Sequence, residues 1–237
     1  MWGGMMILHK TFLTLGLFVL SMGATSLAQA DYEKGLDAYL QGDYETALKE
    51  WLIDADQGHA GAQSNLGRMF HLGNGVSRNY EVAVRWYLLA ADQGLAEAQF
   101  NLGIMYDYGL GLHEDDREAA RWYLLAADQG HTDAQNNLGR LYINGEGLPQ
   151  NYGKAMRWLR LAADQGVAEA QHNLGFIYHS GTGVPKNYII AYMWYNLAAS
   201  QGQDDSSINI NILKELMTPE QIAEAQRLST EWLEEHQ

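Results

Sequence analysis

Apolar side chains recur along most of the chain with the spacing of amphipathic helices. In one stretch the apolar stripe, at positions i, i+4, i+7 and i+8, consists of Ala62, Leu66, Met69 and Phe70. In the stretch that follows, the stripe consists of Ala83, Trp86, Ala90 and Ala91. Such spacing places the side chains on one face of a helix, and that face must be buried against another element. The pattern therefore predicts pairs of short amphipathic helices.

The pattern repeats with a period of 36 residues. Five glycines have this spacing: Gly58, Gly94, Gly130, Gly166 and Gly202. Four tryptophans share it: Trp86, Trp122, Trp158 and Trp194. The run Ala-Gln-x-Asn-Leu-Gly starts at Ala62, Ala98, Ala134 and Ala170. A period of this length is typical of arrays in which each repeat is one small supersecondary unit.

Each repeat carries the signals of two helices joined by a turn. The first helix ends at a glycine pair, because glycine adopts the left-handed backbone that other residues resist. These pairs are Gly73 and Gly75, Gly109 and Gly111, Gly145 and Gly147, and Gly181 and Gly183. The second helix begins after an N-capping side chain, which is Asn79, Asp115, Asn151 or Asn187. One hairpin cannot bury its own apolar face, so we expect the hairpins to stack.

The repeated residues carry a family resemblance. The pattern Ala-Gln-x-x-Leu-Gly-x-x-Tyr-x-x-Gly-x-Gly-Val, followed by Ala-x-x-Trp and Ala-Ala-x-x-Gly, resembles Sel1-like repeats of the tetratricopeptide-repeat-like superfamily. Four copies occupy 59–202, with bounds 59–94, 95–130, 131–166 and 167–202. The resemblance implies an all-α fold, a right-handed superhelical solenoid of antiparallel helix hairpins. It also implies that the first helix of each hairpin lines the concave face.

The segments on either side of the four copies differ from the repeat. Residues 31–58 lack the Gly-x-Gly insertion and are more similar to a tetratricopeptide repeat, so we expect an N-terminal capping hairpin there. Residues 203–237 are expected to form C-terminal capping helices. Thr218, Pro219 and Gln221 have the spacing of a capping box with proline at the first helical position.

Residues 1–30 have the order of a secretory signal peptide. Lys10 is followed by an apolar stretch from Thr11 to about Met22, and small residues then end in Ala28-Gln29-Ala30. Cleavage after Ala30 would produce a periplasmic or secreted protein without stable membrane insertion. The alternative is an uncleaved anchor, although the apolar run is shorter than the roughly 20 residues of a membrane span.

Composition excludes several classes of function. Of the 237 residues, 29 are acidic and 15 are Lys or Arg, so the net charge is −14 and nucleic acid is not expected as a partner. No cysteine is present, which removes disulfides, thiolate nucleophiles and zinc–thiolate sites. The eight histidines form no H-E-x-x-H motif, and the glycine pairs follow a helix, whereas phosphate-binding loops follow a strand. We therefore expect no catalytic residue, no metal and no cofactor.

Comparison of the copies within this chain separates positions needed for the fold from positions free to bind a partner. On the first helix, four repeat positions carry a different residue in different copies, and we call them variable columns. Their spacing of i, i+4, i+7 and i+8 places them in a strip beside the buried stripe. The predicted partner-binding residues are Arg68, His71, Phe100, Ile104, Asp107, Tyr108, Asn136, Arg140, His172, Phe176 and His179. Aromatic and arginine side chains in a groove suit an extended peptide or a protein loop. The alternative is burial of Phe100, Ile104 and Phe176 between adjacent hairpins.

Two other repeat positions keep the same kind of residue in the copies named here, and the role of each has two interpretations. Asn65, Asn101, Asn137 and Asn173 either hydrogen-bond neighbouring loops, which their invariance among the copies favours, or contact the ligand backbone. Lys49, Arg85, Arg121 and Arg157 form a basic series on the second helix, and a solvated outer face is the simpler interpretation.

The sequence predicts an exported protein–protein interaction module, an adaptor that binds a peptide or protein on its concave face as a monomer. A scaffold in envelope polysaccharide or secretion machinery is the alternative, and it shares the same binding mechanism. A β-lactam or cell-wall hydrolase is the weakest alternative. Secreted relatives associated with β-lactam binding carry a cysteine pair in each repeat, which this chain lacks, and the serine–lysine nucleophile motifs are absent too.

Overall fold

The computed structural model describes residues 32–236, and this part of the chain contains twelve helices and no strand. The all-α prediction is therefore confirmed. The predicted signal peptide at 1–30 lies outside the described residues. The helices fall into two compact units that divide between Asn79 and Tyr80.

Unit 1 holds three helices: α3 (Tyr32–Leu40), α4 (Tyr44–Asp56) and α5 (Ala60–Leu72). The first two form a hairpin, and α5 packs on α4. Trp51 of α4 is fully buried, and its indole N–H donates to the Tyr32 carbonyl at 3.3 Å. A Cβ atom at Gly35 would lie 2.5 Å from the Trp51 indole nitrogen, so glycine is needed for α3 to approach α4 this closely.

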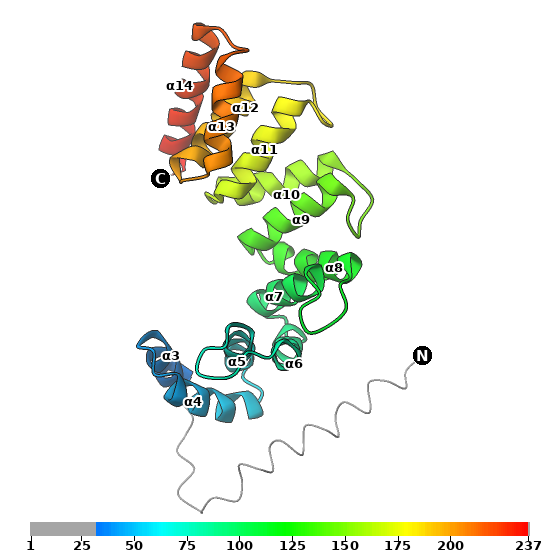
Figure 1. Ribbon diagram of the computed structural model, residues 1–237, viewed down its shortest axis with the longest axis vertical. Helices are drawn as coiled ribbons and strands as arrows, with labels where there is room; N and C mark the ends of the chain where they lie inside the picture. The colour runs from blue at the N-terminus through cyan, green and yellow to red at the C-terminus, as the bar shows by residue number, and fades with distance from the viewer. Residues whose placement is uncertain (1–31, 237) are drawn as a thin grey trace, which may run out of the picture. The chain divides into compact units, whose positions relative to one another are not determined.

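Unit 2 is a solenoid of stacked hairpins. Its helices are α6 (Tyr80–Ala91), α7 (Ala96–Asp107), α8 (Asp116–Asp128), α9 (Thr132–Asn144), α10 (Tyr152–Asp164), α11 (Ala168–Ser180), α12 (Tyr188–Ser200), α13 (Asp204–Lys214) and α14 (Pro219–Glu235). The hairpins are α7 with α8, α9 with α10, and α11 with α12, and each packs on the second helix of the hairpin before it. Figure 1 shows this order along the unit.

The helix ends lie where the repeat pattern predicts them. The side chains of Asp115, Asn151 and Asn187 accept hydrogen bonds from free backbone N–H groups at the starts of α8, α10 and α12. Gly145 and Gly181 end α9 and α11 in the left-handed conformation, with φ of 76° and 75°.

A second repeated glycine brings the two helices of each hairpin together. A Cβ atom built at Gly139 of α9 would lie 2.6 Å from Leu159 Cγ of α10, and one at Gly175 would lie 2.6 Å from the Tyr195 ring. Both distances are shorter than a side chain tolerates, so the hairpins depend on the missing side chain. Small alanines complete the packing, and Ala119, Ala155 and Ala191 are fully or almost fully buried.

A repeated glutamine connects each hairpin to the one before it. Gln135 of α9 is buried, and its amide N–H donates to the carbonyl of Ala127 at the end of α8 at 3.2 Å. Its side-chain oxygen accepts from Gln165, which follows α10, at 3.2 Å. The same pair of bonds joins Gln99 to Ala91 and Gln129, and Gln171 to Ala163 and Gln201. Because buried amides must be satisfied, these bonds fix the position of one repeat on the next.

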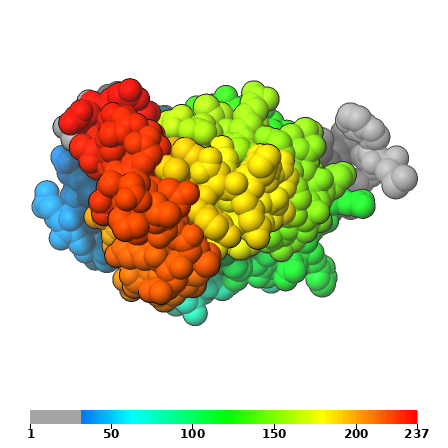
Figure 2. Space-filling view, turned by 90° about the horizontal axis from the view of Figure 1, so that it is seen from above, coloured from blue at the N-terminus to red at the C-terminus, as the bar shows by residue number. Residues whose placement is uncertain are grey.

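The C-terminal helices pack on the last repeat. Thr218 and Gln221 form the predicted capping box at the start of α14, with Pro219 at the first helical position. Trp232 of α14 meets Trp194 of α12 edge to face, with ring centroids 6.0 Å apart. Figure 2 looks onto this end of unit 2 and shows the orange and red residues of α13 and α14 at the surface.

We expect Gln135→Leu to lower the free energy of unfolding by about 1–3 kcal/mol, because the Ala127 carbonyl and the Gln165 amide lose a buried partner. The measurement is urea denaturation followed by circular dichroism. Gln150→Ala is the control, since Gln150 is exposed and its hydrogen bond to the Ile143 carbonyl lies within one repeat, so its loss should cost no more than about 1 kcal/mol. Equal effects of the two variants would show that the buried amide does not hold the repeats in position.

Candidate partner-binding site

The first helices of unit 2 form one continuous face. Arg140 of α9 reaches Asp107 of α7, and Asn173 of α11 donates to Asn136 of α9 at 3.2 Å. The second helices α8, α10 and α12 approach one another less extensively, although the Arg160 guanidinium of α10 lies over the Trp194 ring of α12, 5.0 Å from its centroid. Successive hairpins are therefore closer together on the first-helix side than on the second-helix side.

The predicted residues of unit 1 lie on α5. Arg68 is half-buried, and its guanidinium lies over the Tyr39 ring, 4.6 Å from the ring centroid. His71 is also half-buried, and burial together with the nearby charge of Arg78 lowers the pKa of its imidazole. Both side chains therefore take part in the packing of this unit.

Several predicted residues of unit 2 are partly enclosed by the fold. Phe100 and Ile104 are half-buried against the core around Tyr123, and the Phe100 ring stacks on His131 with centroids 4.4 Å apart. Asn136 is buried. These side chains support the face and offer a partner little surface of their own.

Two aromatic residues stand out from the same face. Tyr108, directly after α7, is 66% exposed, and Phe176 of α11 is 47% exposed. Large exposed aromatic side chains supply contact area at a small entropic cost when a partner covers them. Among the predicted residues these two are the most accessible apolar groups.

Arg140 connects two repeats through charge. Its guanidinium donates to Asp107 at 2.5 Å and to Glu146 at 2.7 Å. The Tyr123 hydroxyl also donates to Asp107, at 3.1 Å. Burial and the neighbouring Asp107 charge raise the pKa of Tyr123, so its phenol stays protonated. Burial lowers the pKa of Arg140, but the charges of Asp107 and Glu146 outweigh this and raise it overall.

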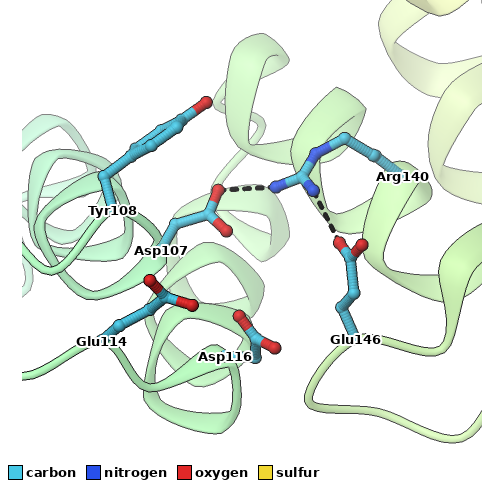
Figure 3. A pocket seen from close by; sticks show the side chains of 6 residues that line it. All are labelled: Asp107, Tyr108, Glu114, Asp116, Arg140 and Glu146. Carbon is cyan, nitrogen blue, oxygen red and sulfur yellow. Dashed lines mark hydrogen bonds and ion pairs between the residues drawn. The ribbon is translucent and has the colours of Figure 1, made fainter.

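This ion pair forms part of the wall of a cavity of about 270 Å³. The residues that line it are Asp107, Tyr108, Glu114, Asp116, Arg140 and Glu146 (Figure 3). Three of the six were predicted from the variable columns of the first helix. Glu114, Asp116 and Glu146 were missed because that comparison covered the first helix, and these residues lie in the loops or at the start of the second helix.

The two histidines of α11 are held by internal hydrogen bonds. His172 Nδ1 lies 2.8 Å from the Ser206 hydroxyl of α13, and His179 Nδ1 lies 3.5 Å from the Tyr195 hydroxyl. Burial lowers the pKa of both imidazoles. Ser206 is fully buried, so its contact with His172 joins α13 to α11.

The repeated asparagine has intramolecular partners in every copy. Asn65 donates to the Tyr32 hydroxyl at 3.3 Å, and Asn101 donates to the Glu97 carbonyl at 2.8 Å. Asn137 hydrogen-bonds the Tyr123 hydroxyl, and Asn173 bonds Asn136 as described above. These contacts favour the structural interpretation of the column.

Neither a metal site nor a membrane-spanning helix occurs in the described part of the chain. No three of its His, Asp or Glu side chains are grouped so that they could hold a metal ion. None of its helices is both long enough and apolar enough to span a bilayer.

We expect His172→Gln to make stability less dependent on pH between 7 and 5.5. The folded state lowers the pKa of His172 below its unfolded value of about 6.5, so the unfolded chain takes up the proton first and stability falls as the pH drops. The glutamine side chain of the variant lacks this titration. Urea denaturation at both pH values measures the difference.

The control for this experiment is His113→Gln, in the exposed loop before α8. It should leave the loss of stability between pH 7 and 5.5 as large as in the wild type. A His172→Gln variant that loses as much stability as the wild type over this range would contradict the expectation.

Matches to a known protein family occur at the same four repeats. The model of the Sel1 repeat family matches residues 60–95, 96–131, 132–167 and 168–203. A Sel1 repeat protein from Oxalobacter formigenes is 36% identical, with a TM-score of 0.71, over 76% of this chain and 74% of that one. No curated protein matches the chain.

A second solved structure is c5321, described as a protective antigen present in uropathogenic Escherichia coli strains and displaying an SLR fold. It is 33% identical, with a TM-score of 0.81, and the match covers 90% of this chain. This chain spans 46% of that protein, or about half its length. The four family matches and these two structures show that the chain belongs to the Sel1 repeat family.

Proposed function

We propose that this protein is an adaptor that binds a protein or peptide partner on the first-helix face of unit 2. Sel1 repeat proteins generally mediate protein–protein interactions. The observation that carries the proposal is the pair of exposed aromatic residues, Tyr108 and Phe176, on a face whose other variable side chains are held in place by the fold. The closer spacing of the hairpins on this side supports its assignment as the concave face.

The rigidity of the face supports binding without a large entropic cost. Phe100 is fixed by stacking on His131, and Arg140 is fixed by two ion pairs. A surface ordered before binding loses little conformational freedom, so more of the contact energy appears as affinity. The exposed aromatic residues then serve as anchors, and the fixed side chains give the surface its shape.

Export is a further part of the proposal. Residues 1–30 have the order of a signal peptide, and cleavage after Ala30 would release the chain into the periplasm or the medium. The E. coli relative is described as a protective antigen, which fits a protein that is met outside the cytoplasm. A scaffold role in envelope polysaccharide or secretion machinery uses the same surface and differs in the partner.

The binding proposal predicts that Tyr108→Ser with Phe176→Ser will lose the partner that the wild-type protein captures from an envelope extract of the producing bacterium. At least a tenfold loss of the captured band is expected, because both anchors are removed. Arg140 is left unchanged, since its loss would strand the buried carboxylate of Asp107.

The matched control is Leu124→Ser with Leu161→Ser. These leucines are 39% and 40% exposed on the second helices α8 and α10, so the variant removes two exposed apolar side chains from the other side of the unit. Capture should be unchanged. The opposite result would be loss of the captured band with the leucine control and its retention with the aromatic variant, Tyr108→Ser with Phe176→Ser. It would place the binding surface on the second helices and contradict the proposal.

The export proposal predicts that the protein recovered from the periplasm or medium begins at Asp31. N-terminal sequencing measures this directly. Changing Ala28 and Ala30 to Arg should block processing, because signal peptidase sites require small side chains at these positions. A wild-type protein found only in the cytoplasm with its first residues intact would contradict export.

A further inference from the structure

The cavity beside Arg140 lies at a departure from the repeat pattern. The first position of the second helix is occupied by Tyr44, Tyr80, Asp116, Tyr152 and Tyr188. Asp116 is thus an acidic residue in a column of tyrosines. Its side chain is shorter than that of tyrosine and lacks the phenol ring that Tyr152 places against its loop.

Contacts of the loop glycines show what the tyrosine does in two other copies. The second glycine of each pair packs against the start of the preceding second helix: Gly75 faces Tyr44, and Gly183 faces Tyr152. A Cβ atom at Gly183 would lie 3.0 Å from Tyr152 Cδ2, so the ring lies against the loop. Gly147 meets the backbone of Asp116, as Gly111 meets that of Tyr80. Asp116 carries no ring that could lie against its loop as Tyr152 does.

Each of the other acidic residues of the cavity is also found in a single copy, Asp107 and Glu114 in 95–130 and Glu146 in 131–166. The position of Glu114 is occupied by Arg78, Gln150 and Lys186 in the other repeats. The position of Glu146 is occupied by Asn74, Leu110 and Thr182. The position of Asp107 is occupied by His71, Ile143 and His179. Since the other repeats fold without these carboxylates, the repeat pattern itself does not require them, and their gathering at one cavity points to binding.

The carboxylates exceed the positive charge available in the wall. Arg140 pairs with Asp107 and Glu146, while no ion pair with Glu114 or Asp116 occurs among the described residues. One guanidinium therefore faces four carboxylates. The excess negative charge attracts a further cation into the cavity.

The shape and the aromatic wall favour a side-chain cation over a metal ion. The carboxylates are spread around the hollow, as Figure 3 shows, and are not grouped as metal ligands. Tyr108 lies at the same cavity and is 66% exposed, so the face of its ring is available to a cation. Carboxylates beside an aromatic ring suit an ammonium or guanidinium group at the end of an aliphatic stem.

We propose that this cavity receives a lysine or arginine side chain of the protein partner, which therefore docks through a basic segment. The inference rests on the proposed binding function and adds the chemistry of the partner. The net charge of −14 further favours the approach of such a segment.

The test uses the purified protein labelled with ¹⁵N and four capped peptides, Gly-Gly-Xaa-Gly-Gly, in which Xaa is lysine, arginine, norleucine or glutamate. The lysine and arginine peptides should shift the amide signals of Tyr108, Arg140 and Gly147 in a saturable manner. The norleucine and glutamate peptides should bind at least tenfold more weakly. Shifts that are absent, or that spread over the acidic surface without saturation, would overturn the proposal.

Asp116→Tyr is the decisive variant, because it places in the cavity the residue that the other repeats carry at this position. It should weaken binding of the lysine peptide at least tenfold. The matched control is Asp128→Tyr, which makes the same change at an exposed position at the far end of α8 and should leave binding within twofold of the wild type. Equal weakening by both variants would attribute the binding to net charge and overturn the proposal.

A second variant keeps the test valid if Asp116→Tyr lowers the melting temperature. Glu114→Gln with Asp116→Asn removes two charges with almost no change in volume, and it should also weaken lysine binding at least tenfold. Unchanged binding would overturn the proposal. The binding function itself is judged separately, by capture of the partner. If the partner is lost with Tyr108→Ser and Phe176→Ser but retained with Asp116→Tyr, the proposed function is sustained. The same result would refute docking of a basic side chain of the partner in the cavity.

Discussion

The buried glutamine of each first helix is the contact on which the rest of the molecule depends. Gln135 satisfies the end of the preceding hairpin and is itself satisfied by Gln165 of its own hairpin, so two repeats share one chain of hydrogen bonds. A buried amide is costly when it loses a partner, so slippage between hairpins is costly too. The fixed spacing that results allows variable side chains on different helices to form one surface.

That surface combines fixed and accessible groups. Arg140 joins α7 to α9 through Asp107, and this contact both holds adjacent hairpins together and forms a wall of the acidic cavity. Tyr108 and Phe176 are exposed beside groups that the fold has already immobilised. The proposed binding function would divide two requirements between these groups, because buried contacts maintain the shape while exposed side chains are free to differ between repeats.

The fold could be predicted from the sequence to a large extent, and the site only in part. The 36-residue period, the glycine pairs and the capping box are local signals, and they predicted the helices and their ends because each signal acts within one or two turns. Side-chain exposure depends on helix rotation and on neighbouring hairpins. Phe100 is consequently half-buried on His131, a contact between two repeats that no local signal contains. Asp116 could have been found, since it interrupts a column of tyrosines.

Site-specific photo-crosslinking tests the central claim most directly. Benzoylphenylalanine placed at position 108 on the first-helix face, and in a separate protein at position 161 on α10, reports which side of unit 2 lies against a partner in the cell. The account predicts a covalent adduct with a single protein from position 108 and none from position 161. An adduct from position 161 alone, or equal adducts from both positions, would contradict it.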